Sequence, residues 1–302
     1  MATIVTRSDV PWAYLPTLAE LTNQSMDSPS HYKDIMEIKD SSISPDKRGI
    51  TTAFAVGIGP LQNWGEVVRV PFDTPDPGRI KTTAYADFGV AVAISRNAVE
   101  DEIYGLYENL GKGLPASHRL FRDLIAQRLL NNFFATTFFT DDSGFGGTAR
   151  ALGATNHASV NGASRPNILA TSASISYQSV IDLFVLGLQH RNEKGYEQPI
   201  WEIGDEIILM VAPADYPMAV KICKSLNDPT NNSNSTNVAM EMARFAPRMN
   251  PFISSVGATG NYWFMVRAKD KGLWLVERRA AEISNYRDPA TKAMVVDLTC
   301  RE

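Results

Sequence analysis

The residue types that most often carry out chemistry in proteins are few in this chain and widely separated. They are the histidines His31, His118, His157 and His190 and the cysteines Cys223 and Cys300. None of them forms a His-Glu-x-x-His or Cys-x-x-Cys pattern, the spacings that bring zinc ligands together locally. The sequence therefore predicts no metal site. It also lacks the Gly-x-Ser-x-Gly pattern that would predict a hydrolase nucleophile.

Two other motifs resemble sites of chemistry but lack features that such sites need. The stretch from Gly105 to Gly113 resembles a phosphate-binding loop, but it has the wrong spacing and ends a predicted helix instead of opening one. The adjacent acids Asp141 and Asp142 follow a predicted helix, where acids are usually solvated turn residues. We predict no catalytic residue and no cofactor. A soluble hydrolase with a site near His157 and Asp141 remains an alternative.

Composition narrows the possible classes of protein further. The 302 residues carry a net charge of −4, so there is no overall positive field to hold a nucleic acid. Two cysteines far apart in sequence are not a disulfide framework and are typical of a reducing cytoplasm. The longest strongly apolar run, 207–213, is too short to cross a bilayer. The N-terminus lacks the apolar core of a secretory signal.

The element that organises the prediction is a long helix at residues 116–139. Apolar pairs recur along it every three to four residues and form a broad stripe that other elements must cover. Pro115 suits its first turn, and Thr140–Gly144 contains turn-forming residues that end it. A shorter helix is predicted to begin at the N-cap Asn97 and to end at Gly111–Gly113.

Ahead of these helices, the sequence predicts segments that lack a core of their own. Strands at 64–72 and 80–94 flank a Pro- and Gly-rich turn at 73–79, which predicts a hairpin. The strand ends near that turn are polar, so the hairpin is expected to project and to be steadied by another surface. Residues 1–50 contain aromatic side chains without an obvious partner in the segment, which favours an arm lying on a neighbouring subunit.

The remainder of the chain mixes helices and strands without regular alternation, which predicts an α+β fold. We predict helices at 175–192 and 218–226, an exposed loop at 227–237, and strands at 207–212, 252–256, 262–268, 273–276 and 292–298. The strand at 207–212 is continuously apolar, so both of its faces are expected to be covered.

An ordered set of short segments then becomes recognisable over about residues 150–280. It consists of Asn156-His157, Asn167-Ile-Leu, the helix ending at His190, Glu206–Pro213, Met249-Asn-Pro-Phe, Tyr262–Ala268 and Glu277-Arg278. This order resembles the major capsid (head) proteins of tailed bacteriophages, which have the Hong Kong 97-type fold. The hairpin and the long helix stand where that family has its extended loop and its long peripheral helix.

The resemblance implies a division of the chain and a set of partners. It implies an N-terminal arm (1–50), an extended loop (51–92), a peripheral domain (93–155 and 262–302) and an axial domain (156–261). Copies of the chain would form hexamers and pentamers of an icosahedral shell in the virion, assembled in the host cytoplasm around double-stranded DNA without sequence-specific binding. Scaffolding, portal and decoration proteins would be further partners, and no membrane would be involved.

The expected contacts between subunits lie on the projecting segments and on one basic pair. They are Trp12, Tyr14, Trp64, Arg69, Asp76, Pro77, Arg79, Lys81, Arg278 and Arg279. Some members of the family crosslink a loop lysine to a neighbour's asparagine, but nothing in the sequence assigns that bond to Lys81. An encapsulin-type nanocompartment shell, which encloses enzymes instead of a genome, is the alternative with the same fold.

Overall fold

The structure is a computed structural model. It describes residues 5–7, 30–40, 49–53, 60–61, 63–64, 66, 68–70, 72–73, 80–95, 106–136, 151–158, 164–171, 173–192, 194–229, 235–253 and 262–302. The chain divides into two units. Unit 1 comprises Met1–Ile50, Thr83–Ala126 and Gly272–Glu302, and unit 2 comprises Thr51–Thr82 and Gln127–Lys271.

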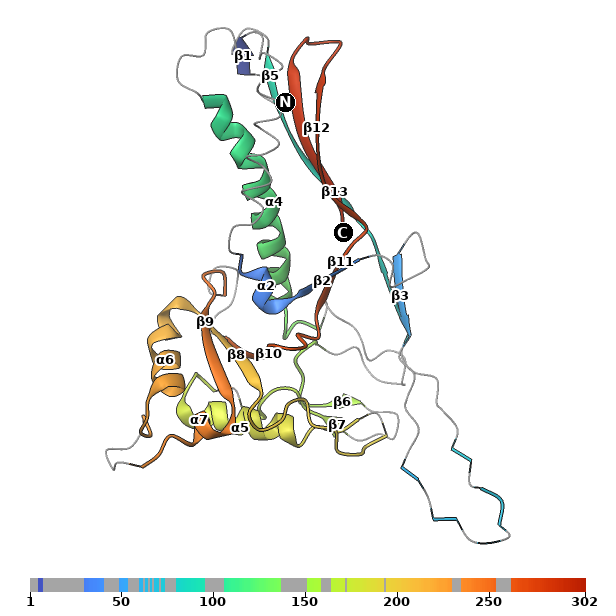
Figure 1. The fold of residues 1–302 in the computed structure, drawn as a ribbon, viewed down its shortest axis with the longest axis vertical. Coiled ribbons are helices and arrows are strands. Elements are labelled where there is room, and N and C mark those ends of the chain that lie inside the picture. The colour runs from blue at the N-terminus through green and yellow to red at the C-terminus, as the bar shows by residue number, and fades with distance from the viewer. Residues whose placement is uncertain are drawn as a thin grey trace. The chain divides into compact units, whose positions relative to one another are not determined.

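Unit 1 is built on a four-stranded sheet with the order β1-β5-β13-β12. Its strands are β1 (Val5–Arg7), β5 (Asp87–Ser95), β12 (Arg279–Arg287) and β13 (Met294–Arg301). Strand β13 runs antiparallel to both β5 and β12, while β1 runs parallel to β5. Figure 1 shows the long strands β5, β12 and β13 side by side. The sequence predicted β13 in part, but it did not predict β12.

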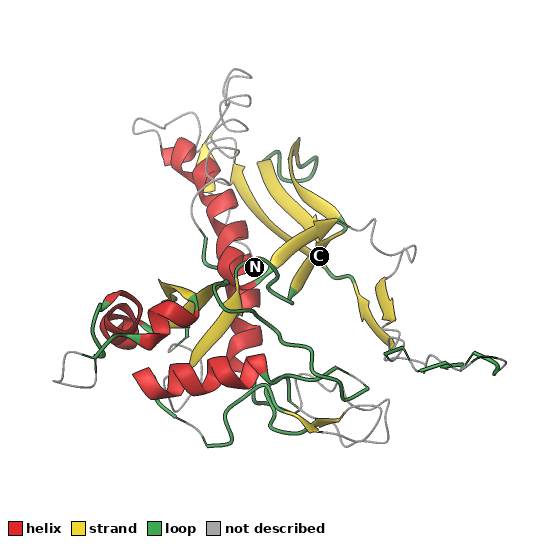
Figure 2. Cartoon of the chain, turned by 60° about the horizontal axis from the view of Figure 1, so that its bottom comes forward, coloured by secondary structure: helices red, strands yellow, loops and turns green. Residues whose placement is uncertain are grey.

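One helix, α4 (Leu106–Asn131), covers the described part of the two helices expected from the sequence, while the predicted start of the first, 97–105, lies outside the described residues. The predicted break at Gly111–Gly113 is wrong, because the helix continues through it and through Pro115. Figure 2 shows a long helix drawn without a break. Leu114 and Pro115 are buried, so tertiary packing outweighs the low helix propensity of glycine and proline here. The predicted end at residue 139 is also wrong, because turns begin directly after Asn131.

Part of the predicted arm packs on unit 1 itself. Helix α2 (Tyr32–Ile35) leads into β2 (Glu37–Asp40), which pairs in parallel with β11 (Trp274–Glu277). The side chains of Tyr32 and Ile35 are buried. Neither α2 nor β2 was predicted, because four-residue elements have too little periodicity to stand out in a sequence.

The predicted hairpin has a different first strand. Strand β3 (Gly49–Ala53) pairs with β4 (Ile80–Ala84), whereas the described residues of 64–72 form turns and irregular structure. The prediction of a strand at 64–72 is therefore wrong. Its valines satisfy β propensity, but propensity alone does not supply a pairing partner. The strand predicted at 80–94 is present as β4 and β5.

Unit 2 contains a three-stranded sheet with β8 (Glu206–Val211) at its centre. Strand β8 is antiparallel to β10 (Trp263–Arg267) and parallel to β9 (Arg244–Met249). Because residues 207–211 are all buried, the covered strand expected from this apolar run is confirmed. Strand β9 was missed, since it contains two arginines and Pro247; an edge strand tolerates proline. The strand predicted from Phe252 is wrong at 252–253, which form a turn.

The remaining elements of unit 2 are mostly helical. They are α5 (Tyr177–Leu188), the 3₁₀ turn Pro213–Asp215, α6 (Tyr216–Lys224), α7 (Val238–Met242) and the short strands β6 (His157–Ala158) and β7 (Ser164–Arg165). Ser176 caps α5 and forms a reciprocal capping box with Ser179. Both predicted helices, 175–192 and 218–226, are confirmed with shorter or shifted bounds. In the described part of the chain, no helix is long and apolar enough to span a bilayer.

Candidate assembly surface and buried polar cluster

The described residues between β3 and β4 expose large apolar side chains. Leu61, Trp64, Val68, Val70 and Phe72 are between 57% and 103% exposed. We call the described residues of 60–73 the exposed segment. Single exposed apolar residues are ordinary on protein surfaces, but five large ones between residues 61 and 72 favour a surface that binds a partner.

Several local contacts restrain the exposed segment. The indole N–H of Trp64 donates a hydrogen bond to the carbonyl of Val68, and the guanidinium of Arg69 lies 4.5 Å from the centre of the Phe72 ring. At the end of the segment, the Asp73 carboxylate forms an ion pair of 2.6 Å with Lys194 of the same unit. These contacts limit the conformations of the segment while leaving its apolar groups in solvent.

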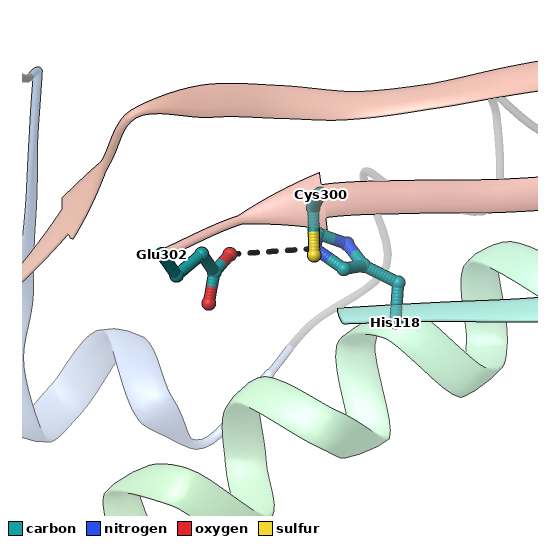
Figure 3. A group of neighbouring side chains, drawn as sticks. All are labelled: His118, Cys300 and Glu302. Atoms are coloured by element: carbon teal, nitrogen blue, oxygen red, sulfur yellow. Dashed lines mark ion pairs between the residues drawn. The ribbon is translucent and has the colours of Figure 1, made fainter. Parts of the chain in front are cut away.

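Unit 1 contains a buried group of ionisable side chains. Helix α4 presents His118 and Arg122 on one face, one turn apart, and the C-terminal end of the chain brings Cys300 and Glu302 against them (Figure 3). Sequence reasoning missed this cluster. The i,i+4 and i,i+2 spacings were visible, but they do not reveal that the helix and the strand meet.

Ion pairs hold this cluster together. Arg122 Nε lies 2.6 Å from Glu302 Oε1, and Arg122 Nη2 contacts the same oxygen and lies 2.9 Å from Glu277 Oε1. The neighbouring Asp123 carboxylate accepts a hydrogen bond of 2.8 Å from the backbone N–H of Tyr32. The helix is thereby tied both to the C-terminal strand and to α2 of the N-terminal segment.

Burial and charge act in opposite directions on these groups. Burial alone would raise the pKa of Glu302, but the interactions with His118 and Arg122 outweigh it and hold that pKa below its ordinary value. Burial and the nearby Glu302 carboxylate raise the pKa of the Cys300 thiol. Glu302 is therefore a carboxylate and Cys300 a protonated thiol at neutral pH in the absence of a further ligand.

Comparison with known proteins gives a result at the level of fold. No protein-family model matches the chain, and no curated protein matches it either. Among solved structures, the capsid of bacteriophage JBD30 matches with a TM-score of 0.57 and 12% identity, over 75% of this chain and 92% of that one. The capsid of cyanophage Pam1 matches with a TM-score of 0.50 and 12% identity, over 100% and 90%.

The mature capsid of bacteriophage PhiM1 also matches, with a TM-score of 0.50 and 8% identity, over 100% of this chain and 87% of that one. This chain has the fold of tailed-bacteriophage capsid proteins. The resemblance inferred from the sequence is thereby confirmed for the fold. Because the identities are so low, the capsid fold is established by the path of the backbone and not by shared residues.

Two residues that carried the sequence resemblance, His157 and Asn167, have structural roles. His157 Nε2 lies 3.0 Å from the carbonyl oxygen of Leu152. The Asn167 amide donates to that same carbonyl at 2.7 Å and accepts a hydrogen bond of 2.9 Å from the N–H of Ala154. Both side chains therefore order the loop at 152–154. Asp141, the other residue of the hydrolase alternative, lies outside the described residues.

The predicted subunit contacts are only partly visible. Trp64 and Arg69 lie in the exposed segment, and Arg278 and Arg279 are exposed at the junction of β11 and β12. The residues Trp12, Tyr14, Asp76, Pro77 and Arg79, and the side chain of Lys81, lie outside the described part. All ten remain predicted contacts, and the exposed apolar groups Leu61, Val68, Val70 and Phe72 join them.

Proposed function

We propose that this chain is a major capsid protein, a structural shell subunit that assembles with copies of itself and has no catalytic activity. The observation that carries the proposal is the exposed segment, displayed on a chain with the capsid fold. Its apolar side chains become buried only if another surface covers them. In a shell, that surface belongs to another copy of the same chain. Burial of apolar area would drive the association.

We propose further that the chain is divided as in capsid proteins of the Hong Kong 97 type. We assign residues 1–50 to an arm, 51–92 to the extended loop, 93–155 and 262–302 to a peripheral domain, and 156–261 to an axial domain. A ring of one chain needs two different complementary surfaces on each subunit, which makes its interfaces head-to-tail. In this proposal, the exposed segment of one subunit supplies one surface, and the body of its neighbour supplies the other.

We propose further that hexamers and pentamers of this chain enclose double-stranded DNA in the virion. The net charge of −4 supports a shell that does not bind its DNA tightly, because each phosphate neutralised by a basic side chain would add affinity for DNA. Tight binding of the isolated subunit to duplex DNA at physiological salt would contradict this part of the proposal. Scaffolding, portal and decoration proteins are the further partners of such a shell.

Assembly can be tested by sedimentation and electron microscopy of the expressed chain. The wild type is expected to form rings, sheets or shells. A variant carrying Leu61→Ser, Trp64→Ser and Phe72→Ser is expected to remain a separate subunit, with its unfolding free energy changed by no more than about 0.5 kcal/mol for each substitution because these side chains are exposed.

The matched control replaces exposed apolar side chains of unit 2 outside the segment, Ile203→Ser and Leu226→Ser, which are 73% and 79% exposed. This control is expected to assemble. A wild-type chain that stays monomeric, or an assembly unaffected by the triple change, would overturn the proposal. The contents of the shells decide between genome and cargo: enclosed duplex DNA supports the phage head, whereas enclosed enzyme would indicate the nanocompartment alternative.

A further inference from the structure

Three buried side chains of unit 1 bring metal-binding atoms together. An imidazole nitrogen of His118, the Sγ of Cys300 and a carboxylate oxygen of Glu302 all lie within 4.8 Å of one another. Figure 3 shows the imidazole extending from helix α4 towards the thiol and the carboxylate at the end of the chain. Imidazole, thiolate and carboxylate are the three ligand types that zinc takes from proteins.

The spacing suits a tetrahedral ion. His118 Nε2 and Glu302 Oε1 are 3.5 Å apart. Two ligands bound at about 2.1 Å with a tetrahedral angle between them lie about 3.4 Å apart. The imidazole and the carboxylate are therefore about as far apart as two ligands of one zinc ion, although their contact is too long for an optimal hydrogen bond. Because Arg122 contacts Oε1, Oε2 is the carboxylate oxygen that remains for the ion.

Two polar atoms of the cluster make no hydrogen bond. His118 Nε2 and Glu302 Oε2 are both buried and without such a partner. The His118 residue is 8% exposed and the Glu302 side chain 1% exposed. A buried polar atom left without a hydrogen bond usually costs about 1–3 kcal/mol. The contact that His118 Nε2 makes is the ion pair with Glu302 Oε1, so a cation at this point would give a ligand to that nitrogen and to Glu302 Oε2, neither of which makes a hydrogen bond.

The balance of charge points the same way. With Cys300 deprotonated, three negative groups (the thiolate, Glu277 and Glu302) lie near two positive groups, Arg122 and Arg279. That set has a net charge of −1, so it attracts a cation. Arg122 contacts Oε1 of Glu302, so Oε2 of the same carboxylate is left to bind a metal ion.

We propose that His118, Cys300 and Glu302 form a zinc-binding site. On binding, the Cys300 thiol gives up its proton to solvent and its sulfur bonds to Zn²⁺, together with the neutral imidazole and the carboxylate. Three protein ligands leave the fourth tetrahedral position to water. The ion ties the middle of α4 to the C-terminal end of the chain within unit 1.

The test uses the full-length chain as dispersed subunits, so that its outcome does not depend on shell assembly. Zinc is added, unbound metal is removed, and the metal content is measured. About one zinc ion per chain is expected, and Cys300→Ser and His118→Ala should each weaken binding by more than about 100-fold. The matched control is Cys223→Ser, which changes the other buried cysteine and should leave binding unchanged.

Substitution with Co²⁺ gives a second readout that needs no variant. Cobalt bound by Cys300 should show the near-ultraviolet charge-transfer absorption of a cobalt–thiolate bond. Its absence from the folded wild type would overturn the proposal. So would zinc binding that survives Cys300→Ser, because it would show an adventitious ion only. The same cobalt spectrum decides the question if Cys300→Ser does not fold.

Discussion

The two units bury the interiors of their sheets by different means. In unit 2, the core formed by α5, α6 and β8 is apolar, with Val180, Leu209, Val211 and Ile222 all fully or almost fully buried. In unit 1, the buried side of α4 includes His118, Arg122 and Asp123. One unit thus uses non-directional apolar packing, and the other places ion pairs where its helix meets its C-terminal strand.

This difference indicates which interactions fix the packing of each unit. Apolar packing tolerates substitutions that conserve volume, because dispersion and burial have no preferred direction. An ionic contact such as that of Arg122 with Glu302 and Glu277 is satisfied in one register and costly in others. The polar cluster therefore defines the position of α4 in unit 1, whereas unit 2 depends on the shape and volume of its core.

The largest effect is expected in the core of unit 2. Phe184 is fully buried and lies 5.8 Å from Trp201 and 6.0 Å from Phe245, ring centre to ring centre. Phe184→Ala should lower the unfolding free energy of unit 2 by about 3–5 kcal/mol through the cavity it leaves. This loss of unfolding free energy can be measured by denaturant unfolding, with hydrogen exchange of the β8 amides as the probe of unit 2. Leu226→Ala, at an exposed position, is the control; a similar loss there would contradict the comparison.

The next effect tests the ionic packing of unit 1. Arg122→Met leaves Glu302 buried without its charge partner and should destabilise unit 1 by about 3 kcal/mol, measured by hydrogen exchange in β13 with a chelator present. Adding Glu302→Gln removes the uncompensated charge and should recover part of that loss. If the effects of the two changes simply add, the pair is not coupled and the comparison fails.

Unit 2 also buries polar side chains, and Asn237 tests how much one of them contributes to a mainly apolar core. Asn237 is 1% exposed; its amide donates to the carbonyls of Ile222 and Ser225 at 2.8 and 2.7 Å, and its oxygen caps α7 at Ala239 N. Asn237→Ala should cost about 2 kcal/mol, because buried carbonyls and an N–H lose their partners. Asn237→Asp keeps the cap and loses the donors, so thermal unfolding should place it between Ala and wild type.

The smallest effect concerns the backbone of unit 1. Lys292, in the turn between β12 and β13, has φ 58°, which a residue with a Cβ adopts at a cost. Lys292→Gly should stabilise the hairpin by about 0.5 kcal/mol, the relief of strain being partly offset by the greater entropy of glycine in the unfolded chain. Lys292→Ala is the control and should give no gain. Equal stability of the two variants would exclude backbone strain as the cause.

Much of the fold could be predicted from the sequence where the apolar residues of a segment follow the pattern of a helix or a strand. Strand β8 was predicted because a central strand is apolar throughout, and α5 because its apolar residues recur with the period of a helix. The capsid fold itself was predicted from the order of such segments. The predictions failed where the partner of a segment decides its structure. Residues 64–72 resemble a strand in composition, but β4 pairs with β3 instead.

By itself, the sequence determined the α+β character and the buried strand of unit 2, whereas the exposure of the apolar groups ahead of β4 came only from the structure. Only the tertiary structure decided that α4 continues through Gly111, Gly113 and Pro115, since buried packing at Leu114 outweighs local propensity. It alone brought His118 to Cys300 and Glu302, residues far apart in the chain. Local periodicity reports which face of an element is buried, but it does not report which element covers that face.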